Sequence, residues 1–345
     1  MLKYIFTITV FALMSAPLRA DTVVDLRPFP IKYEPRFAPQ LVAHRGMLRF
    51  APENTILSME IAYRRGFRFI EIDVVVTRDG EFLVFHDRHL RRLGKDIGVC
   101  DIDLEEIKKE TPAVLFFSDV FGLSREQSKK AIKLADPWVA ELQKSTLPSL
   151  DEVFSKFGQG IYYHLDLKSL NCKQERILMT HKLLELVSKH SLERHVFIES
   201  QDPGILSLIK ALNSSQLVLY WRDDIHRQDR QIINYLETLK FDGIDHSGGT
   251  LDGSSSNRID GIYLFTFTIN SLSKIERLRP IYDFILTDLD AIHKKPLNKY
   301  EFFNSRSSKV KILRSAADPK YKALVAEGFQ EVMQTKHAAR VLLRE

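Results

Sequence analysis

Two carboxylates inside one apolar segment have the clearest chemical meaning in this sequence. Glu71 and Asp73 are separated by one residue, so in a strand both side chains point to the same face. Buried side by side, they repel each other and lose hydration, which a divalent cation compensates. Asp166, in a later segment, completes an all-oxygen set that favours Mg²⁺ or Ca²⁺ over Zn²⁺. A salt-bridge network with Arg45 and Lys168 is the alternative to a metal site.

Two histidines stand at the ends of apolar segments that flank this pair in the chain. His44 ends one segment and His86 ends another. Imidazole is the side chain best suited to exchange protons near neutral pH, so one neutral and one protonated histidine provide a base and an acid. Arg45 and Lys168 add fixed positive charge that suits phosphate oxygens. Together these residues predict phosphoryl chemistry.

Eight short apolar runs, separated by amphipathic segments, are the elements that must position these groups. They cover 41–44, 69–76, 82–86, 161–168, 195–200, 216–221, 262–270 and 283–288. Several are rich in β-branched and aromatic residues, as expected of parallel strands covered on both faces. The repeated strand–helix unit predicts an α/β fold, a TIM (β/α)8 barrel, with a doubly wound open sheet as the alternative.

Residues 88–149, between the third and fourth runs, exceed the roughly 2 to 6 residues of an ordinary barrel loop. We expect an insertion on the catalytic face. Its aromatic residues form either a substrate-facing wall or a small core of the insertion itself. These residues are Phe116, Phe117, Phe121 and Trp138.

The first twenty residues have the order of a secretory signal peptide, with a basic start, an apolar stretch and a small residue before the expected cleavage. The apolar stretch is shorter than the roughly 20 residues that cross a bilayer as a helix. An uncleaved anchor or a buried helix is the alternative. We therefore expect a signal peptide (1–20), an extended arm (21–40), a barrel (41–295) and a partly helical extension (296–345), in an exported, periplasmic or secreted protein.

Composition sets few limits on partners. The chain has 345 residues, 44% of them hydrophobic, and a net charge of +5 that falls to +3 without Lys3 and Arg19. The positive charge is spread along the chain and not concentrated in a nucleic-acid-binding block, so it says little about partners, and we expect no nucleic acid. Cys100 and Cys172 are the only cysteines, and in an oxidising compartment they form either one disulfide or none.

Several short motifs occur in the order and spacing of a known family. They are His44-Arg45-Gly46, Pro52-Glu53-Asn54-Thr55, Glu71-x-Asp73-Val74, Thr77-x-Asp79-Gly80 and His86-Asp87. Weaker similarity continues through 147–153, 166–168, 267–270 and 285–288. The sequence thus resembles glycerophosphodiester phosphodiesterases over roughly residues 41 to 290.

This resemblance implies a TIM barrel that hydrolyses glycerophosphodiesters to sn-glycerol 3-phosphate and an alcohol. It implies three sets of residues: metal ligands Glu71, Asp73 and Asp166, acid/base residues His44 and His86, and phosphate-binding Arg45 and Lys168. Glu53 either binds the glycerol end or the metal, or orients Arg45. The implied cofactor is one divalent cation, Mg²⁺ or Ca²⁺.

The sequence departs from the family pattern at three positions. Asp166 stands where Glu is usual, His164 where Asn is common, and Phe267 replaces a tryptophan, which keeps an apolar wall but removes an N–H donor. Asp166-Leu167-Lys168 is similar to sphingomyelinase D-type phospholipases. An exported phospholipase acting on intact lysolipids or sphingolipids is therefore one alternative, and a non-catalytic binding barrel is another.

Overall fold

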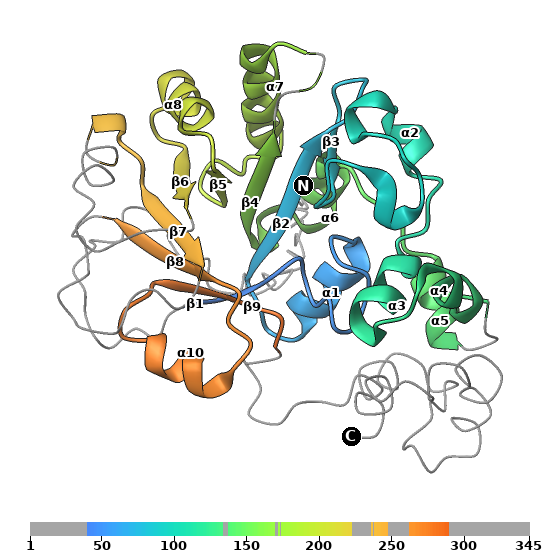
Figure 1. Cartoon of the computed structure of the whole chain (residues 1–345). Helices are drawn as coiled ribbons and strands as arrows, with labels where there is room; N and C mark the ends of the chain where they lie inside the picture. The colour runs from blue at the N-terminus through green and yellow to red at the C-terminus, as the bar shows by residue number, and fades with distance from the viewer. Residues whose placement is uncertain are drawn as a thin grey trace, which may run out of the picture.

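Eight parallel strands form a closed barrel in the computed structural model, which describes residues 40–133, 137–169, 172, 174–222, 236, 238–247 and 262–289 (Figure 1). Their order is β1-β9-β8-β7-β6-β5-β4-β2, and pairing of β1 with β2 closes the sheet. The strands are β1 (Gln40–Ala43), β2 (Phe69–Val76), β4 (Tyr162–Ser169), β5 (Val196–Ser200), β6 (Leu217–Trp221), β7 (Gly243–Ser247), β8 (Tyr263–Phe267) and β9 (Phe284–Thr287). The predicted TIM barrel is confirmed, and the open sheet is excluded.

One predicted barrel strand is wrong and another was missed. The run 82–86 contains β3 (Phe82–Val84), which pairs antiparallel with β2 and lies outside the closed ring. Only residues 77–81 connect β2 and β3, which suffices for a hairpin, whereas a parallel pair needs a crossover of about a dozen residues or more. The missed strand is β7, whose sequence Gly-Ile-Asp-His-Ser is too polar to stand out as an apolar run.

Helices cover the outside of the barrel, and side-chain caps set where several of them begin (Figure 1). They are α1 (Ile56–Arg64), α6 (Leu150–Phe157), α7 (Arg176–Lys189), α8 (Pro203–Leu212) and α10 (Leu272–Leu278). Thr55 and Ser149 each form a capping box at α1 and α6, and Asp202 accepts a 2.8 Å hydrogen bond from the Gly204 amide at α8. These caps fix where α1, α6 and α8 begin.

The insertion lies between β3 and β4, and therefore between the second and third strands of the closed ring. It contains η1 (Leu90–Leu93), η2 (Val99–Asp101), α2 (Leu104–Ile107), α3 (Ala113–Phe121), α4 (Arg125–Ala131) and α5 (Pro137–Gln143). Phe116, Phe117 and Phe121 are buried against one another with ring centroids 5.7 to 5.8 Å apart. These three phenylalanines belong to the same buried cluster as Met59 of α1 and Val74 of β2, so they pack the insertion against the barrel and do not form a separate core of the insertion. The side chain of Trp138 lies outside the described residues.

An apolar layer fills the bottom of the barrel. Its members are Val42, Phe69, Tyr162, Phe197, Leu219, Phe265, Phe284 and Leu286. Phe265 and Phe284 stack with centroids 4.1 Å apart, and Phe69 stacks on Tyr162 at 4.6 Å. Side chains alternate along each strand, so the next inward positions toward the C-terminal ends form a separate layer above this plug. That layer is mostly polar, with Trp221 and Phe267 as apolar members, and it is where the site lies.

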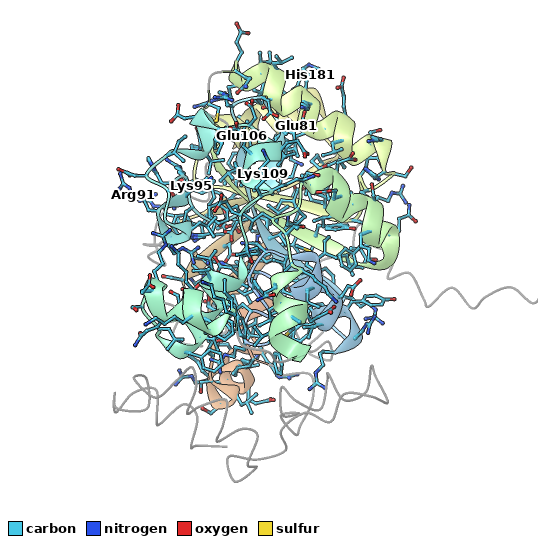
Figure 2. The ribbon with its side chains drawn as sticks, turned by 90° about the vertical axis from the view of Figure 1, so that its right-hand side faces the viewer. Glu81, Arg91, Lys95, Glu106, Lys109 and His181 are labelled. Atoms are coloured by element: carbon cyan, nitrogen blue, oxygen red, sulfur yellow. A yellow bond between two sulfur atoms is a disulfide. The ribbon has the colours of Figure 1, made fainter. Side chains whose placement is uncertain are left out.

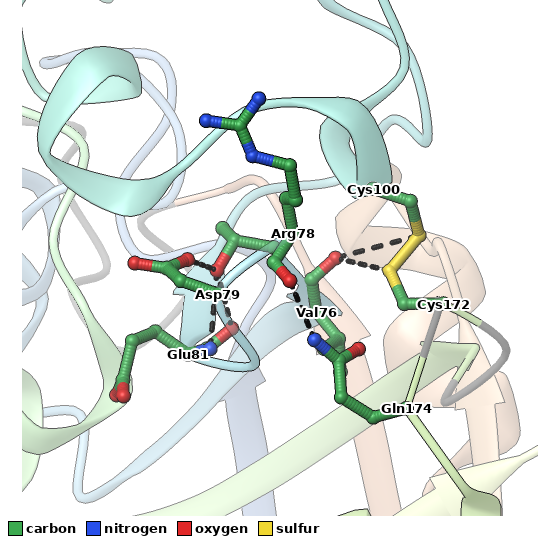
Figure 3. Close-up of a disulfide and its surroundings, with 8 residues drawn as sticks. Val76, Arg78, Asp79, Glu81, Cys100, Cys172 and Gln174 are labelled. Carbon is green, nitrogen blue, oxygen red and sulfur yellow. Dashed lines mark hydrogen bonds between the residues drawn. A yellow bond between two sulfur atoms is a disulfide. The ribbon is translucent and has the colours of Figure 1, made fainter.

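A disulfide between Cys100 and Cys172 ties the insertion to the segment after β4 (Figure 3). The two sulfur atoms lie 3.6 and 2.9 Å from the carbonyl oxygen of Val76, at the end of β2. Gln174 donates to the carbonyl of Arg78 at 2.5 Å on the same side (Figure 3). The bond fixes the base of the insertion against the strand that carries Glu71 and Asp73.

The outer face over the insertion carries charges of both signs. Figure 2 shows Arg91, Lys95, Glu106 and Lys109 on the insertion, with His181 on α7 nearby. Within the described part of the chain, every helix is too short or too polar to span a bilayer. The predicted signal peptide, the arm up to residue 39 and the C-terminal extension lie outside the described residues.

Candidate active site

One cavity of about 1040 Å³ opens at the C-terminal ends of the strands. Its lining includes all seven residues that the sequence assigned to chemistry: His44, Arg45, Glu71, Asp73, His86, Asp166 and Lys168. This is the end of a TIM barrel where working groups normally gather. The structure therefore brings the predicted residues together, from strands far apart in the chain.

Strand register places the three predicted metal ligands side by side. Asp73 of β2 is paired with Asp166 of β4, and Glu71 lies one inward position below Asp73. Carboxylate oxygens of all three residues lie within 4.8 Å of one another. Burial and the neighbouring Asp73 raise the pKa of Glu71, and burial with Glu199 raises the pKa of Asp166 to about 6. An all-oxygen set short of positive charge fits a hard divalent cation.

Arg45 and Lys168 compensate mainly one of these carboxylates. Arg45 Nε lies 3.1 Å from Asp73, and Lys168 Nζ lies 2.8 Å from the other oxygen of Asp73 and also binds Asp166. Burial alone would raise the pKa of Asp73, but these two cations hold it below its usual range. The salt bridges predicted as the alternative are therefore present, yet they leave Glu71 without a side-chain cation at hydrogen-bond distance among the described residues.

The turn after β1 aims backbone and side-chain donors at the carboxylates. Arg45 and Asn54 have positive φ angles of 54° and 58°. The Arg45 amide donates to Glu71 Oε2 at 2.8 Å, and the Asn54 side chain donates to Asp73 at 2.7 Å. Asn54 also accepts from the Asp73 amide at 3.2 Å. The sequence did not assign Asn54 a role, although it lies in the motif beside Glu53.

His44 is held by a carboxylate from the last strand end. Its Nδ1 lies 2.7 Å from Asp288, and its Nε2 lies 4.0 Å from Glu71. Asn270 donates to the second Asp288 oxygen at 2.5 Å. Burial would raise the pKa of Asp288, but the hydrogen bond with His44 and that histidine's charge outweigh burial and lower it. This arrangement fixes the ring and leaves Nε2 to exchange a proton in the cavity.

His86 reaches the same cavity by a different route from the one predicted. Because β3 returns antiparallel along β2, the Phe85 amide donates to the Asp73 carbonyl at 3.0 Å, and His86 follows beside Asp73. Its Nδ1 lies 2.6 Å from Asp87. The hairpin, rather than a barrel strand, thus delivers the second histidine.

Glu53 joins two arginines behind the cavity. Arg45 donates to one oxygen at 2.9 Å, and Arg92 of the insertion donates to the other at 2.6 Å. Arg92 also donates to Asp87 at 2.5 Å and to Asp119 at 3.0 Å. Glu53 is buried and does not line the cavity, so it orients Arg45 and links it to the partner of His86. No sequence signal identified Arg92, because it lies in the insertion.

An apolar wall completes the cavity. Phe267 of β8 lines it as predicted, and Trp221 of β6 stands beside it with ring centroids 5.7 Å apart. The sequence reasoning passed over Trp221. Its position as the last inward residue of an apolar run was the available signal.

One end of this TIM barrel combines two histidines held by carboxylates, a set of clustered carboxylates and fixed cations. This combination is suited to the hydrolysis of phosphate esters. Residues 44–289, more than half of the chain, match the sequence model of the Glycerophosphoryl diester phosphodiesterase family. The chain belongs to this family, which confirms the predicted resemblance and enzyme class.

Relatives and solved structures agree. The glycerophosphodiester phosphodiesterase of Bacillus subtilis (strain 168) is 27% identical over 69% of this chain and 78% of its own length. That of Bacillus altitudinis is 27% identical over 72% and 94%. An Oleispira antarctica phosphodiesterase, solved with the product sn-glycerol-3-phosphate, matches with a TM-score of 0.57 at 27% identity over 73% of this chain and 94% of that one. A Silicibacter pomeroyi structure at 19% identity, with a TM-score of 0.60 over 76% and 94%, supports the fold alone.

Proposed function

We propose that this protein hydrolyses glycerophosphodiesters to sn-glycerol 3-phosphate and an alcohol, in glycerophospholipid and glycerol metabolism. The observation that carries the proposal is the pair of histidines, His44 and His86, each held at Nδ1 by a carboxylate and both facing one cavity beside three clustered carboxylates. The names of the relatives and the product found in the Oleispira antarctica structure support the same substrate class.

The chain's own residues divide the work. One histidine accepts a proton from the nucleophile, either the glycerol 2-hydroxyl or water, and the other donates a proton to the leaving alcohol oxygen. Lys168 and Arg45 supply positive charge beside the phosphate position. Glu71, Asp73 and Asp166 would hold one Mg²⁺ or Ca²⁺, which when bound draws charge from a phosphoryl oxygen. Asn54 and Asp288 keep Asp73 and His44 in place.

Product analysis tests this function. The full chain would be stripped with chelator and incubated with glycerophosphocholine, glycerophosphoethanolamine and glycerophosphoglycerol, with and without added Mg²⁺, Ca²⁺ or Mn²⁺. We expect sn-glycerol 3-phosphate and the free alcohol only after a cation is restored. Release of phosphocholine instead, or no turnover of any diester with any of these cations, alone or combined, would overturn the proposal. A transient cyclic phosphate in ³¹P spectra would identify the 2-hydroxyl as nucleophile.

A lipid substrate is the second candidate, and the wall formed by Trp221 and Phe267 favours it. A glycerophosphodiester has little apolar surface to place against two aromatic rings, whereas a lysolipid or sphingolipid has a chain. The test is the same assay with lysophosphatidylcholine and sphingomyelin. A kcat/KM for either lipid above that for glycerophosphocholine would favour a phospholipase.

We also propose that the protein is exported to the periplasm or the medium. The order of residues 1–20 supports a signal peptide, and the Cys100–Cys172 disulfide suits an oxidising compartment. Cell fractionation with N-terminal sequencing of the mature chain tests this. Recovery of an intact Met1 terminus in the cytosolic fraction would contradict it.

A further inference from the structure

A second group of side chains that could hold a metal ion lies in the barrel interior, at the bottom of the cavity. His164 of β4, Glu199 of β5 and Asp245 of β7 all point inward, and their candidate ligand atoms lie within 4.8 Å of one another. They are 2%, 3% and 0% exposed. His164 lies two residues before Asp166, one inward position deeper on the same strand. This group, the His164/Glu199/Asp245 cluster, shares no residue with the predicted metal ligands.

Its polar atoms are not satisfied within the protein. Both carboxylate oxygens of Asp245 and the Nδ1 of His164 have no hydrogen-bond partner among the described residues. Two buried carboxyl groups side by side are unfavourable when both are ionised, and Asp245 adjoins Glu199 closely enough for the two to share a proton. Asp245 is fully buried and points into the cluster, so a bound cation would take the place of that shared proton.

Shifts of about half an ångström would let these side chains share one ion. His164 Nε2 lies 2.6 Å from Glu199 Oε2 and 3.9 Å from Asp245 Oδ2. Ligand atoms about 2.1 Å from a common ion stand roughly 3.0 to 3.5 Å apart, between these two values. One imidazole nitrogen with two carboxylates is a mixed set that suits Mn²⁺ or Zn²⁺ better than Mg²⁺ or Ca²⁺.

The net charge of the site also favours a second cation. Five inward carboxylates share this part of the barrel, and they are Glu71, Asp73, Asp166, Glu199 and Asp245. Among the described residues, Arg45 and Lys168 are the fixed cations paired with them. If bound cations displaced their protons, all five carboxylates would be ionised. With His164 as a neutral ligand, three negative charges would then be in excess, and one divalent cation would leave one that repels an anionic diester. A second divalent cation reverses the sign, and the bound diester then neutralises it.

The cluster is connected to the cavity. Glu199 and Asp245 line the cavity together with the predicted metal ligands, so an ion has a route to them. Asp166 and Glu199 are paired in the register of β4 and β5, so the two carboxylate groups adjoin. We propose that the His164/Glu199/Asp245 cluster is a second cation site, of the Mn²⁺ or Zn²⁺ class, and that the complete centre holds two divalent cations.

Metal stoichiometry tests the proposal without reference to any substrate. The full chain would be stripped with chelator, reloaded with Mn²⁺, freed of excess by gel filtration and analysed by plasma mass spectrometry. We expect two equivalents of Mn²⁺ per chain. Asp245→Asn and Glu199→Gln should each retain one, and Glu71→Gln should retain one in the second site.

Asp242→Asn is the matched control, because Asp242 is a largely buried carboxylate just before β7 that pairs with Lys210 at 2.7 Å instead. It should keep two equivalents. Anomalous scattering at the manganese edge, from crystals of the unmutated chain, should place one peak between His164, Glu199 and Asp245, which covers the case that the variants do not fold. One equivalent in the unmutated chain, two in folded Asp245→Asn, or no such peak would overturn the proposal and leave a proton-sharing carboxylate pair. None of these outcomes bears on whether the substrate is a glycerophosphodiester.

Discussion

His44 and His86 are held alike: in each, a carboxylate fixes Nδ1 while the ring stands at the cavity. Replacing either by Ala removes a positioned acid or base, which is typically worth about 10² to 10⁴ in rate. We expect kcat on glycerophosphocholine to fall by that factor in His44→Ala and in His86→Ala, with the far-ultraviolet circular dichroism unchanged.

His181→Ala is the control for these two variants, since His181 is an exposed histidine on α7, away from the cavity lining (Figure 2). Its kcat should match that of the unmutated protein. If both His44→Ala and His86→Ala kept kcat within threefold of normal, the acid/base assignment would be wrong.

The Asp87 carboxylate, which holds His86, also contributes to the stability of the fold, and this contribution depends on pH. Burial would raise the pKa of Asp87, but hydrogen bonds from His86 and Arg92 lower it from 3.8 to about 2. The ionised carboxylate therefore stabilises the fold at pH values above about 4, and this stabilisation is lost as the pH falls toward 2. After allowance for solvent at this half-buried site, it amounts to about 1 to 2 kcal/mol.

Asp87→Asn should therefore lower the free energy of unfolding in urea by about 1 to 2 kcal/mol at pH 7, by less at pH 3, and hardly at all near pH 2. A gap to the unmutated protein that is constant across this range would show that packing, and not charge, is what the variant loses.

The sequence identified the residues whose types carry chemistry, but of the residues that position them it singled out only Glu53. Glu71, Asp73 and the two histidines are recognisable because a charged group at an apolar strand or strand end needs an explanation. Asp288 and Asn54 are ordinary loop residues until the strands close into a barrel and bring them to His44 and Asp73. Their roles depend on contacts across 244 and 19 residues, which no local pattern records.

At the scale of elements, the hydrogen bonds of one side chain hold the insertion against the site. Arg92 lies in η1 and donates hydrogen bonds to Asp87, Glu53 and Asp119. Arg92→Ala leaves these carboxylates without that partner, so we expect a loss of about 2 kcal/mol in stability. It should also lower kcat, by less than His86→Ala does, because Asp87 then holds His86 less firmly.

Lys109→Ala is the control for Arg92→Ala, because Lys109 is an exposed cation of the insertion that does not line the cavity (Figure 2). It should change neither kcat nor the urea midpoint. Equal effects of the two substitutions would mean that the loss of a positive charge, and not the loss of the hydrogen bonds of Arg92, is responsible.

The disulfide is the second link between the insertion and the barrel. Cys100 and Cys172 are 72 residues apart in the chain, and closing a loop of that size removes about 4 kcal/mol of unfolded-state entropy. The double variant Cys100→Ser/Cys172→Ser should lower the free energy of unfolding by up to that amount, and reductant should reproduce the loss in the unmutated protein. An unchanged urea midpoint in both experiments would contradict a structural role.

β3 and β7 are the two strands that were not predicted correctly from the sequence. The number of predicted runs was correct only because a hairpin strand was counted and a barrel strand was not. Apolar periodicity detects strands that face an apolar core on both sides, and β7 instead turns Asp245 into the polar layer. A polar barrel strand is therefore hidden by the same feature that makes it functional.

For the whole molecule, the two proposed cation sites would act as cross-links between barrel strands. Glu71, Asp73 and Asp166 join β2 to β4, and the His164/Glu199/Asp245 cluster joins β4, β5 and β7. A cation that binds only the folded barrel stabilises it by mass action, about 2.7 kcal/mol at a concentration 100 times its Kd. For a barrel of this size, that corresponds to a rise of roughly 5 to 10 °C in the melting temperature.

We therefore expect chelator to lower the melting temperature of the full chain, and Mg²⁺, Ca²⁺ or Mn²⁺ to restore it in a concentration-dependent way. The double variant Glu71→Gln/Asp245→Asn, which weakens both sites, should melt at the same temperature with and without added cation. The reason is that its neutral amides replace the charged oxygens that bind the ion while keeping their hydrogen-bonding shape. Equal melting temperatures of the unmutated protein in chelator and in millimolar cation would contradict binding at either site, because a ligand of the folded state cannot leave the equilibrium unchanged.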